Sequence, residues 1–372
     1  MKIVFDGLIY SLQKQGGISR YSDELINGLA ERPDCEVIVL LRKNLLGKVF
    51  GAKVKIEVID SVINSNNKVA KYLSVFIDRI KTWIFLRNRK DLQNTILHST
   101  YYRILPNIKA KQVITVHDLI HEKFTWGFSG ILNKIYVINK KRSISKADSL
   151  IAVSQNTKDD LVSLYGIKPQ KIDITYLGVS KIFTSLKEDN PVKPFFLFVG
   201  TRDHHKNFSF LIKAFSAWSK KNDYELVCLG GGKINSEENK LINDLGLQKT
   251  VRHVLDVSDK NLVTYYNKAK ALIYPSLYEG FGLPIIEAMA CGTPVICSDI
   301  PVFREIGGKS PLLFKDDPTD LLKCLDDVIE SRHLDIDGSI DWSRRFTWEK
   351  TVSATVEVYK KLLESNSVDT NI

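Results

Sequence analysis

Four charged residues lie beside glycine-containing loops in the second half of the chain, and their types suit one kind of ligand. Arg202 and Lys206 follow the apolar run 195–199, just before a predicted helix. Glu279 precedes, and Glu287 follows, the start of a second predicted helix. Two cations beside a helix N-terminus can hold a diphosphate, because the side chains and the free amides both attract an anion. Carboxylates repel a phosphate, so here they are suited to accept hydrogen bonds from sugar hydroxyl groups.

Each pair also has a purely structural interpretation. Arg202 and Lys206 can belong to an ordinary basic loop. Glu279 and Glu287 can be a loop acid and a solvated helical residue. Residue types alone do not distinguish these structural roles from ligand binding. The surrounding sequence is therefore needed to decide.

The segment between the two acids reads as a loop that opens into a helix. Gly280 and Gly282 flank Phe281, and a proline two residues later fits a first helical turn, where its missing amide would be unpaired anyway. We expect the helix to begin near Leu283. The apolar run 271–274 before the loop is typical of a buried parallel strand. The amides of Gly282 and Leu283 should therefore face an anion at the carboxyl end of a strand.

The string E-G-F-G-L-P followed by I-I-E-A-M-A-C-G-T-P-V-I resembles the glutamate, seven residues, glutamate motif of family 4 retaining glycosyltransferases. The resemblance covers nearly the whole chain and is most specific at 199–207 and 271–299. It implies sugar transfer from a nucleoside diphosphate sugar with retention of anomeric configuration. By this resemblance Glu287 holds the ribose and Glu279 the sugar hydroxyls. Arg202, Lys206 and the Gly282 and Leu283 amides stabilise the departing diphosphate.

The same resemblance implies further donor-site residues. Gly200 opens the loop that contains Arg202, and Gly230 begins a glycine run that lets a base or ribose approach the backbone. Gly16 and Gly17 lie near the transferred sugar and acceptor, although two glycines can also simply form a turn. His117 is placed beside the donor sugar, its alternative being a satisfied structural histidine. We interpret three other residues as structural: His98, Asp118 and His121.

The order of elements predicts an α/β fold. Strands at 2–5, 36–41, 54–58, 95–98, 112–115 and 149–153 alternate with helices, as in a doubly wound parallel sheet. The resemblance implies a GT-B fold, in which two Rossmann-like domains face a central cleft. We place the acceptor domain at 1–182 and the donor domain at 183–343, joined by a linker at 187–194. The C-terminal helix, at about 344–364, is expected to cross back to the first domain.

Composition narrows the partners and the compartment. The chain has 372 residues, a net charge of +10 and five cysteines without a metal-ligand spacing. The positive charge favours an anionic partner, but no nucleic-acid motif accompanies it. Scattered cysteines and an early Asp6 predict a reducing cytoplasm rather than secretion. We expect no metal, because two cations can neutralise the diphosphate and no acidic ligand cluster is evident.

A basic amphipathic segment spans residues 68–90. Its apolar stripe consists of Val69, Leu73, Phe76, Ile77, Ile80, Trp83 and Ile84, and Lys68, Lys71, Arg79 and Lys81 lie off the stripe. Such a helix can lie in an anionic membrane interface. It can equally pack its stripe on its own sheet and leave the basic face in solvent. A second basic cluster at 140–146 adds weight to the membrane interpretation.

The resemblance is greatest to bacterial mannosyl- and rhamnosyltransferases that build O-antigen or capsule chains. We expect GDP-mannose as donor, with dTDP-rhamnose and UDP-sugars as alternatives, and a saccharide or lipid-linked acceptor. The enzyme is expected in the cytoplasm, peripherally at the inner face of the membrane. Two other classes remain open: a nucleotide-sugar epimerase of the same fold, and a non-catalytic nucleotide- or lipid-binding protein.

Overall fold

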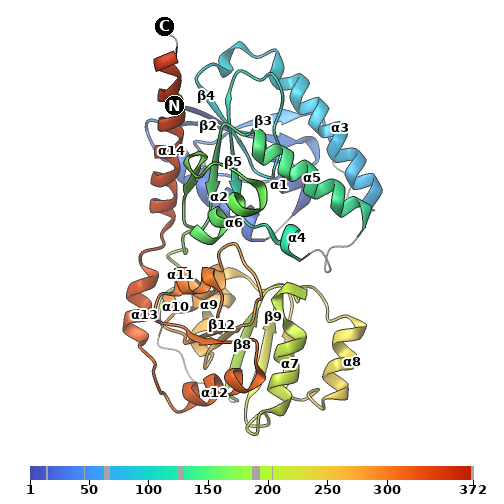
Figure 1. Cartoon of the computed structure of the whole chain (residues 1–372), viewed down its shortest axis with the longest axis vertical. Coiled ribbons are helices and arrows are strands. Elements are labelled where there is room, and N and C mark those ends of the chain that lie inside the picture. Colours follow the sequence, from blue (N-terminus) through green and yellow to red (C-terminus); the bar gives the residue numbers. More distant parts are fainter. Residues whose placement is uncertain are drawn as a thin grey trace. The chain divides into compact units, whose positions relative to one another are not determined.

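A computed structural model describes residues 1–13, 16–45, 47–62, 68–124, 130–186, 193–202 and 204–369. The chain forms two compact units (Figure 1). The first comprises Met1–Glu122, Phe128–Leu177 and Trp348–Ile372, and the second Lys123–Gly127 and Gly178–Thr347. Residues 187–192 of the expected linker lie outside the described residues.

The first unit contains a seven-stranded parallel sheet in the order β3-β2-β1-β4-β5-β6-β7. Its strands are β1 Lys2–Phe5, β2 Glu36–Arg42, β3 Lys55–Ile59, β4 Thr95–Ser99, β5 Lys111–Val116, β6 Ser149–Ala152 and β7 Ile172–Ile174. The order runs outward from β1 in both directions, which confirms the doubly wound prediction. The sequence did not predict β7, because three residues with Asp173 at the centre show no strand pattern.

Helices connect the strands and cover the sheet. In the first unit they are α1 Ile9–Leu12, α2 Gly17–Ala30, α3 Lys68–Arg87, α4 Ile120–Lys123, α5 Ile131–Lys146, α6 Gln155–Tyr165 and α14 Trp348–Asp369. The C-terminal helix α14 packs on α2 and β6, so the expected return to the first domain is confirmed. The close approach requires Gly28, because a Cβ there would meet Val352 Cγ2 at 2.5 Å.

Helix α3 turns its apolar stripe outward. Leu73, Phe76 and Ile84 are 59%, 60% and 51% exposed. Its buried side carries Asp78, Thr82 and Leu86. The alternative in which the stripe packs on the sheet is therefore wrong for these three residues, although Trp83 of the same stripe does pack against the core of the sheet, beside Leu86. The side chains of Lys68, Val69 and Lys71 lie outside those that the structure describes.

The second unit contains a six-stranded parallel sheet in the order β10-β9-β8-β11-β12-β13. Its strands are β8 Phe195–Val199, β9 Glu225–Leu229, β10 Val251–Val254, β11 Leu272–Tyr274, β12 Val295–Ser298 and β13 Leu312–Phe314. Its helices are α7 Phe208–Ala217, α8 Ser236–Asp244, α9 Asp259–Lys268, α10 Leu283–Ala290, α11 Pro301–Gly307, α12 Pro318–Ile329 and α13 Ile336–Ser343.

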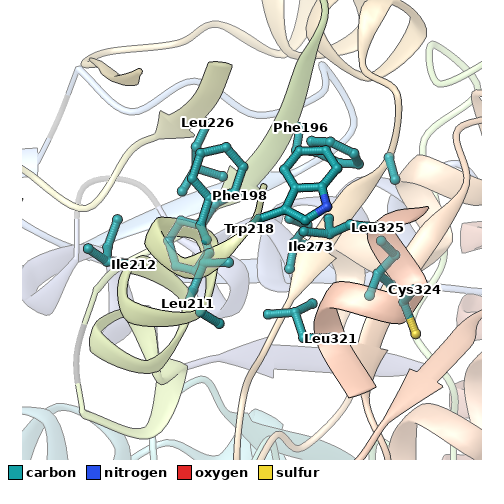
Figure 2. Close-up of a cluster of buried hydrophobic side chains, with 14 of the residues drawn as sticks. Phe196, Phe198, Leu211, Ile212, Trp218, Leu226, Ile273, Leu321, Cys324 and Leu325 are labelled. Atoms are coloured by element: carbon teal, nitrogen blue, oxygen red, sulfur yellow. The ribbon is translucent and has the colours of Figure 1, made fainter. Parts of the chain in front are cut away.

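One hydrophobic core fixes the second sheet against its helices (Figure 2). Trp218 is 2% exposed and packs between β8, α7 and α12, with Phe196, Leu211 and Leu325 among its neighbours in the cluster. Its indole Nε1 donates to Asp326 Oδ1 at 3.1 Å, so the ring is held at its polar end as well. The core gives the loops at the carboxyl ends of the strands a rigid base.

The break before α14 corrects one sequence expectation. We placed the start of the last helix at about residue 344, but α13 ends at Ser343 and α14 begins at Trp348. Between them the Phe346 carbonyl accepts the amide of Val179, and Thr347 pairs with Val179 as an isolated bridge. Residues 344–345 form a turn and Thr347 lies in the bridge, so the two helices are separate elements. Across the described residues, no helix is long and apolar enough to cross a membrane.

Candidate active site

Three loops of the second unit meet at one edge of its sheet. They follow the neighbouring strands β9, β8 and β11, and parallel strands place their carboxyl ends together. The loop after β8 contains Gly200, Arg202 and Lys206, and the loop after β11 contains Glu279. The amide of Leu277 donates to the His205 carbonyl at 2.8 Å and joins these two loops directly.

The sequence predicted that Lys206 and Glu279 belong to one site, and the structure brings their side chains together. The Lys206 Nζ lies 2.5 Å from Glu279 Oε1 and 2.8 Å from the hydroxyl of Tyr274. Burial opposes the charged form of the lysine, but the Glu279 carboxylate and Tyr274 outweigh it and raise the pKa of Lys206. Lys206 is therefore a fixed cation at neutral pH.

Helix α7 begins directly after this loop. Asn207 occupies the N-cap position, but its backbone is left-handed with a φ of 54° and its side chain makes no cap hydrogen bond. The Nδ2 group donates instead to Asp316 Oδ1 at 3.3 Å.

Arg202 lies on the glycine loop after β9. Its guanidinium donates to the carbonyls of Gly230, Gly232 and Lys233 at 2.9, 3.0 and 3.0 Å. Its Nε donates to Glu238 Oε1 at 3.0 Å, and the arginine side chain is only 3% exposed. The described contacts thus join Arg202 to the β9 loop, whereas those of Lys206 join it to the β11 loop.

The start of α10 offers amides as expected. Gly282 is its N-cap residue, with a φ of 113° and no side-chain cap, and Pro284 lies in the first turn. A Cβ at Gly282 would lie 3.1 Å from both Ile306 Cδ1 and Phe303 Cε1, so the position favours glycine. The neighbouring Phe281 is 4% exposed and belongs to the buried floor of the loop.

Glu287 is buried rather than solvated. It is 3% exposed on α10, and the Tyr266 hydroxyl donates to its Oε2 at 3.1 Å. Burial, and then the Glu287 carboxylate, raise the pKa of Tyr266, so its hydroxyl stays a donor. A buried carboxylate held by a tyrosine excludes the solvated-helix interpretation.

In the first unit His117 follows β5 and lies against α2. Its ring makes an edge contact with Tyr21, at 4.9 Å between centroids. Burial lowers the pKa of His117 to about 4, so the imidazole is neutral at neutral pH. Gly16 and Gly17 begin α2, where the Gly16 carbonyl accepts bonds from the Arg20 amide and the Ser19 hydroxyl, each at 3.0 Å.

A buried polar network beneath His117 was not predicted. His98 Nε2 lies 2.9 Å from Thr115 Oγ1, which also bonds the Tyr21 hydroxyl at 2.9 Å. The other His98 nitrogen bonds the hydroxyl of Tyr359 on α14. His98 is therefore structural, as interpreted from the sequence. Its partner is 261 positions away, so no local signal could reveal the pairing.

Asp118 and His121 also have structural partners. Asp118 Oδ1 accepts the Ile120 amide at 3.2 Å, and His121 Nδ1 lies 2.7 Å from Asn133 Oδ1. As far as the described part of the chain extends, no group of three or more His, Cys, Asp or Glu side chains is arranged to hold a metal ion.

Two family descriptions match adjoining parts of the chain. Residues 15–181 match Glycosyltransferase Family 4, and residues 183–336 match Glycosyl transferases group 1. Together with two Rossmann-like parallel-sheet units, these matches define a GT-B glycosyltransferase.

Individual relatives agree with this class. The O-antigen chain mannosyltransferase RfbU of Salmonella typhimurium is 31% identical over 298 residues, which are 79% of this chain and 82% of the relative. The O-antigen chain mannosyltransferase B of Escherichia coli is 27% identical over 97% of this chain and 100% of its own length. The structure of sucrose-phosphate synthase from Thermosynechococcus elongatus superposes with a TM-score of 0.82 at 19% identity, covering 98% of this chain and 100% of that one. The chain belongs to glycosyltransferase family 4, and it is a hexosyltransferase.

Proposed function

We propose that this chain is a retaining transferase that moves a mannosyl unit from GDP-mannose onto a lipid-linked or saccharide acceptor. The process is bacterial O-antigen or capsule synthesis. Two relatives are O-antigen chain mannosyltransferases by name, which supports the sugar and the process. dTDP-rhamnose and UDP-sugars are the alternative donors.

The observation that carries this proposal is the Lys206–Glu279 pair beside the start of α10. Lys206 is held as a cation, and the uncapped amides at Gly282 and Leu283 come from the same loop as Glu279. Charge that develops on a departing diphosphate is stabilised by preorganised donors of this kind. Glu279 then accepts the sugar hydroxyls, and the buried Glu287 accepts the ribose hydroxyls.

The remaining step follows the mechanism that the family resemblance implies. The acceptor attacks on the face from which the diphosphate departs, and the leaving phosphate takes the acceptor proton. No metal is required, because Lys206 and the helix amides neutralise the diphosphate. In the first unit, the neutral His117 and the Gly16–Gly17 turn serve sugar and acceptor recognition.

Donor turnover with and without acceptor tests the proposal. GDP-mannose, dTDP-rhamnose and UDP-sugars are supplied with lipid-linked saccharides, in buffer with and without EDTA. We expect acceptor-dependent release of nucleoside diphosphate, unaffected by EDTA. Epimerised donor without acceptor identifies an epimerase, and nucleotide binding without turnover identifies a binding protein. Activity that EDTA abolishes and magnesium restores contradicts the metal-free mechanism.

We also propose that the enzyme docks peripherally at the cytoplasmic face of an anionic membrane. The support is an apolar surface on two helices of the first unit, named here the α3–α5 face. It consists of Leu73, Phe76, Ile77, Ile80 and Ile84 on α3, and Ile131, Ile135 and Ile138 on α5. These residues are 42–71% exposed. Their spacing of three or four residues puts each set on one side of its helix.

The two helices lie side by side (Figure 1). Arg142 of α5 is near enough to Arg79 of α3 to lower its pKa, after the larger effect of burial. Exposed cations accompany the apolar side chains on both helices: Lys81, Arg87, Lys134, Lys141, Arg142 and Lys146. Apolar side chains with neighbouring cations suit an anionic lipid surface.

Buried charges fix which side of each helix faces outward. Asp78 of α3 pairs with Arg42 of β2 at 2.6 Å and with Arg103 at 2.7 Å. Lys140 of α5 is 1% exposed and donates to the Asp118 carbonyl at 2.8 Å. Rotating either helix to bury its isoleucines would expose or unpair these charges, at a cost of several kcal/mol, about 3–5 for a broken buried pair. The outward apolar face is therefore a defined feature of the fold.

A further inference from the structure

Arg202 directs its hydrogen-bond donors at its own protein surroundings, above all at the carbonyls of the loop after β9. A guanidinium has five N–H groups. Its Nε bonds Glu238, and its Nη1 bonds the Gly230 carbonyl and His253 Nε2 at 2.9 and 3.1 Å. Its Nη2 faces the carbonyls of Gly231, Gly232 and Lys233 at 3.3, 3.0 and 3.0 Å. Four of the five N–H groups are thus directed at the Glu238 carboxylate and at loop carbonyls, and the fifth faces His253 Nε2, which itself lies 2.9 Å from the Gly230 carbonyl oxygen.

The glycine loop is shaped around this guanidinium. Gly230, Gly231 and Gly232 are all left-handed, with φ of 82°, 75° and 73°. A Cβ at Gly231 would lie 2.8 Å from both Arg202 Nη1 and the Gly200 carbonyl oxygen. Any residue larger than glycine at position 231 would therefore clash with Arg202 and with the backbone of the loop that contains Arg202.

The carbonyl contacts also set where the loop amides point. In a trans peptide the C=O and N–H groups point in opposite directions. Because the carbonyls of Gly230, Gly231 and Gly232 face Arg202, the amides of the residues that follow them are turned away from it. Gly231, Gly232 and Lys233 are exposed, so these amides lie on the open side of the loop.

We infer that Arg202 is a positioning residue that holds the 230–233 loop in the shape that receives the nucleoside part of the donor, and that it does not bind the diphosphate. The assignment rests on the proposed function for the identity of the ligand. It replaces the direct contact with phosphate that the sequence suggested. Lys206 and the start of α10 then remain as the diphosphate contacts.

Arg202→Lys tests the inference, because a lysine keeps the charge but cannot hold four carbonyls. Two measurements are made: hydrogen exchange of the 230–234 amides without ligand, and binding of guanosine, GMP and GDP, with the uridine series in parallel. We expect faster exchange in this loop. We also expect affinity for nucleoside, monophosphate and diphosphate to fall by a common factor of about 10, the effect of a 1.4 kcal/mol loss.

Two further variants separate the roles. Lys206→Ala should weaken diphosphate binding alone and leave exchange in 230–234 unchanged. Glu238→Gln removes the charge that holds Arg202 Nε but keeps a residue type that completes the capping box of α8, so it should raise exchange in the same loop without unfolding that helix.

A loss confined to diphosphate in Arg202→Lys, with unchanged loop exchange, overturns the inference. If no nucleotide binds the wild type, the proposed function fails, while the exchange measurement still decides whether Arg202 holds the loop.

Discussion

Lys206 and Glu279 form an ion pair across two loops, with 2.5 Å between Nζ and Oε1 and side chains only 14% and 15% exposed. The residues are 73 positions apart and follow the adjacent strands β8 and β11. Removing one member of such a sheltered pair leaves the other charge without its partner. A substitution of Glu279 therefore acts on Lys206 as well as on any bound sugar.

The two acids should respond differently to neutral substitution. Glu279→Gln should depress turnover and leave nucleoside diphosphate binding largely intact, because Lys206 remains free to meet the phosphates. Glu287→Ala should weaken that binding, because the ribose loses its acceptor and Tyr266 loses its partner. Calorimetric titration with GDP and UDP separates the two effects. Equal loss of nucleoside diphosphate affinity in both variants would reverse the assignment.

Local sequence was sufficient for the elements that carry the site. Apolar runs and helix signals predicted every strand of the first sheet except β7, and Gly282 with Pro284 predicted the start of α10. These features depend on neighbours in the chain, so periodicity and turn chemistry reveal them.

Long-range side-chain contacts could not be read in the same way. Arg202 is bonded to carbonyls 28–31 positions away, and the sequence signalled only a cation near a helix start. Periodicity showed one apolar side on α3 but not the direction it faces, because that depends on Asp78 meeting Arg42 and Arg103. Such pairings require the tertiary fold.

The α3–α5 face should bind anionic vesicles. We expect the wild type to sediment with vesicles that contain phosphatidylglycerol, and salt to weaken binding, since each near-surface cation contributes about 1 kcal/mol. Leu73→Gln combined with Ile80→Gln should reduce binding strongly. Leu164→Gln is the matched control, because Leu164 is 40% exposed on α6, outside the face.

Two outcomes would contradict membrane docking. Binding that ignores lipid charge and salt would remove the electrostatic part of the argument. A concentration-dependent dimer in light scattering, abolished by the same double variant, would make the face an interface between two copies of the chain.

The buried ion network beneath α3 should be essential for stability. The Arg42 and Arg103 guanidinium groups, acting against the effect of burial, hold the pKa of Asp78 at about 2. Asp78→Asn removes the carboxylate paired with the buried Arg42 and leaves Arg103 only the more distant Asp6, at 4.0 Å, so the free energy of unfolding should fall by about 3–5 kcal/mol. Urea unfolding measures the change. Glu31→Gln is the control, because its pair with Lys53 is 65% and 61% exposed and should contribute less than about 1 kcal/mol. Similar effects of the two substitutions would show that the buried network does not fix α3.

His98 should make the protein less stable as the pH falls below neutrality. Burial lowers its pKa to about 3, against an ordinary value of 6.5. Between these values the unfolded chain takes up a proton that the native protein does not. Stability is therefore fully present above pH 6.5 and is lost as the pH falls, by up to about 1.4 kcal/mol per pH unit from this group.

Urea unfolding at about pH 7 and about pH 5 checks the effect, with the ordinary histidine value as the reference for the window. His98→Gln should be less stable than the wild type at the higher pH, because the buried bonds to Thr115 and Tyr359 change. Its loss of stability on acidification should be smaller, because the titrating group is gone and contributions from other groups, including His117, are common to both proteins. His333→Gln is the control, since His333 is exposed on the second unit and should leave the wild-type pH dependence intact. If His98→Gln and the wild type lose the same free energy of unfolding between the two pH values, His98 is not the group that links protonation to the fold.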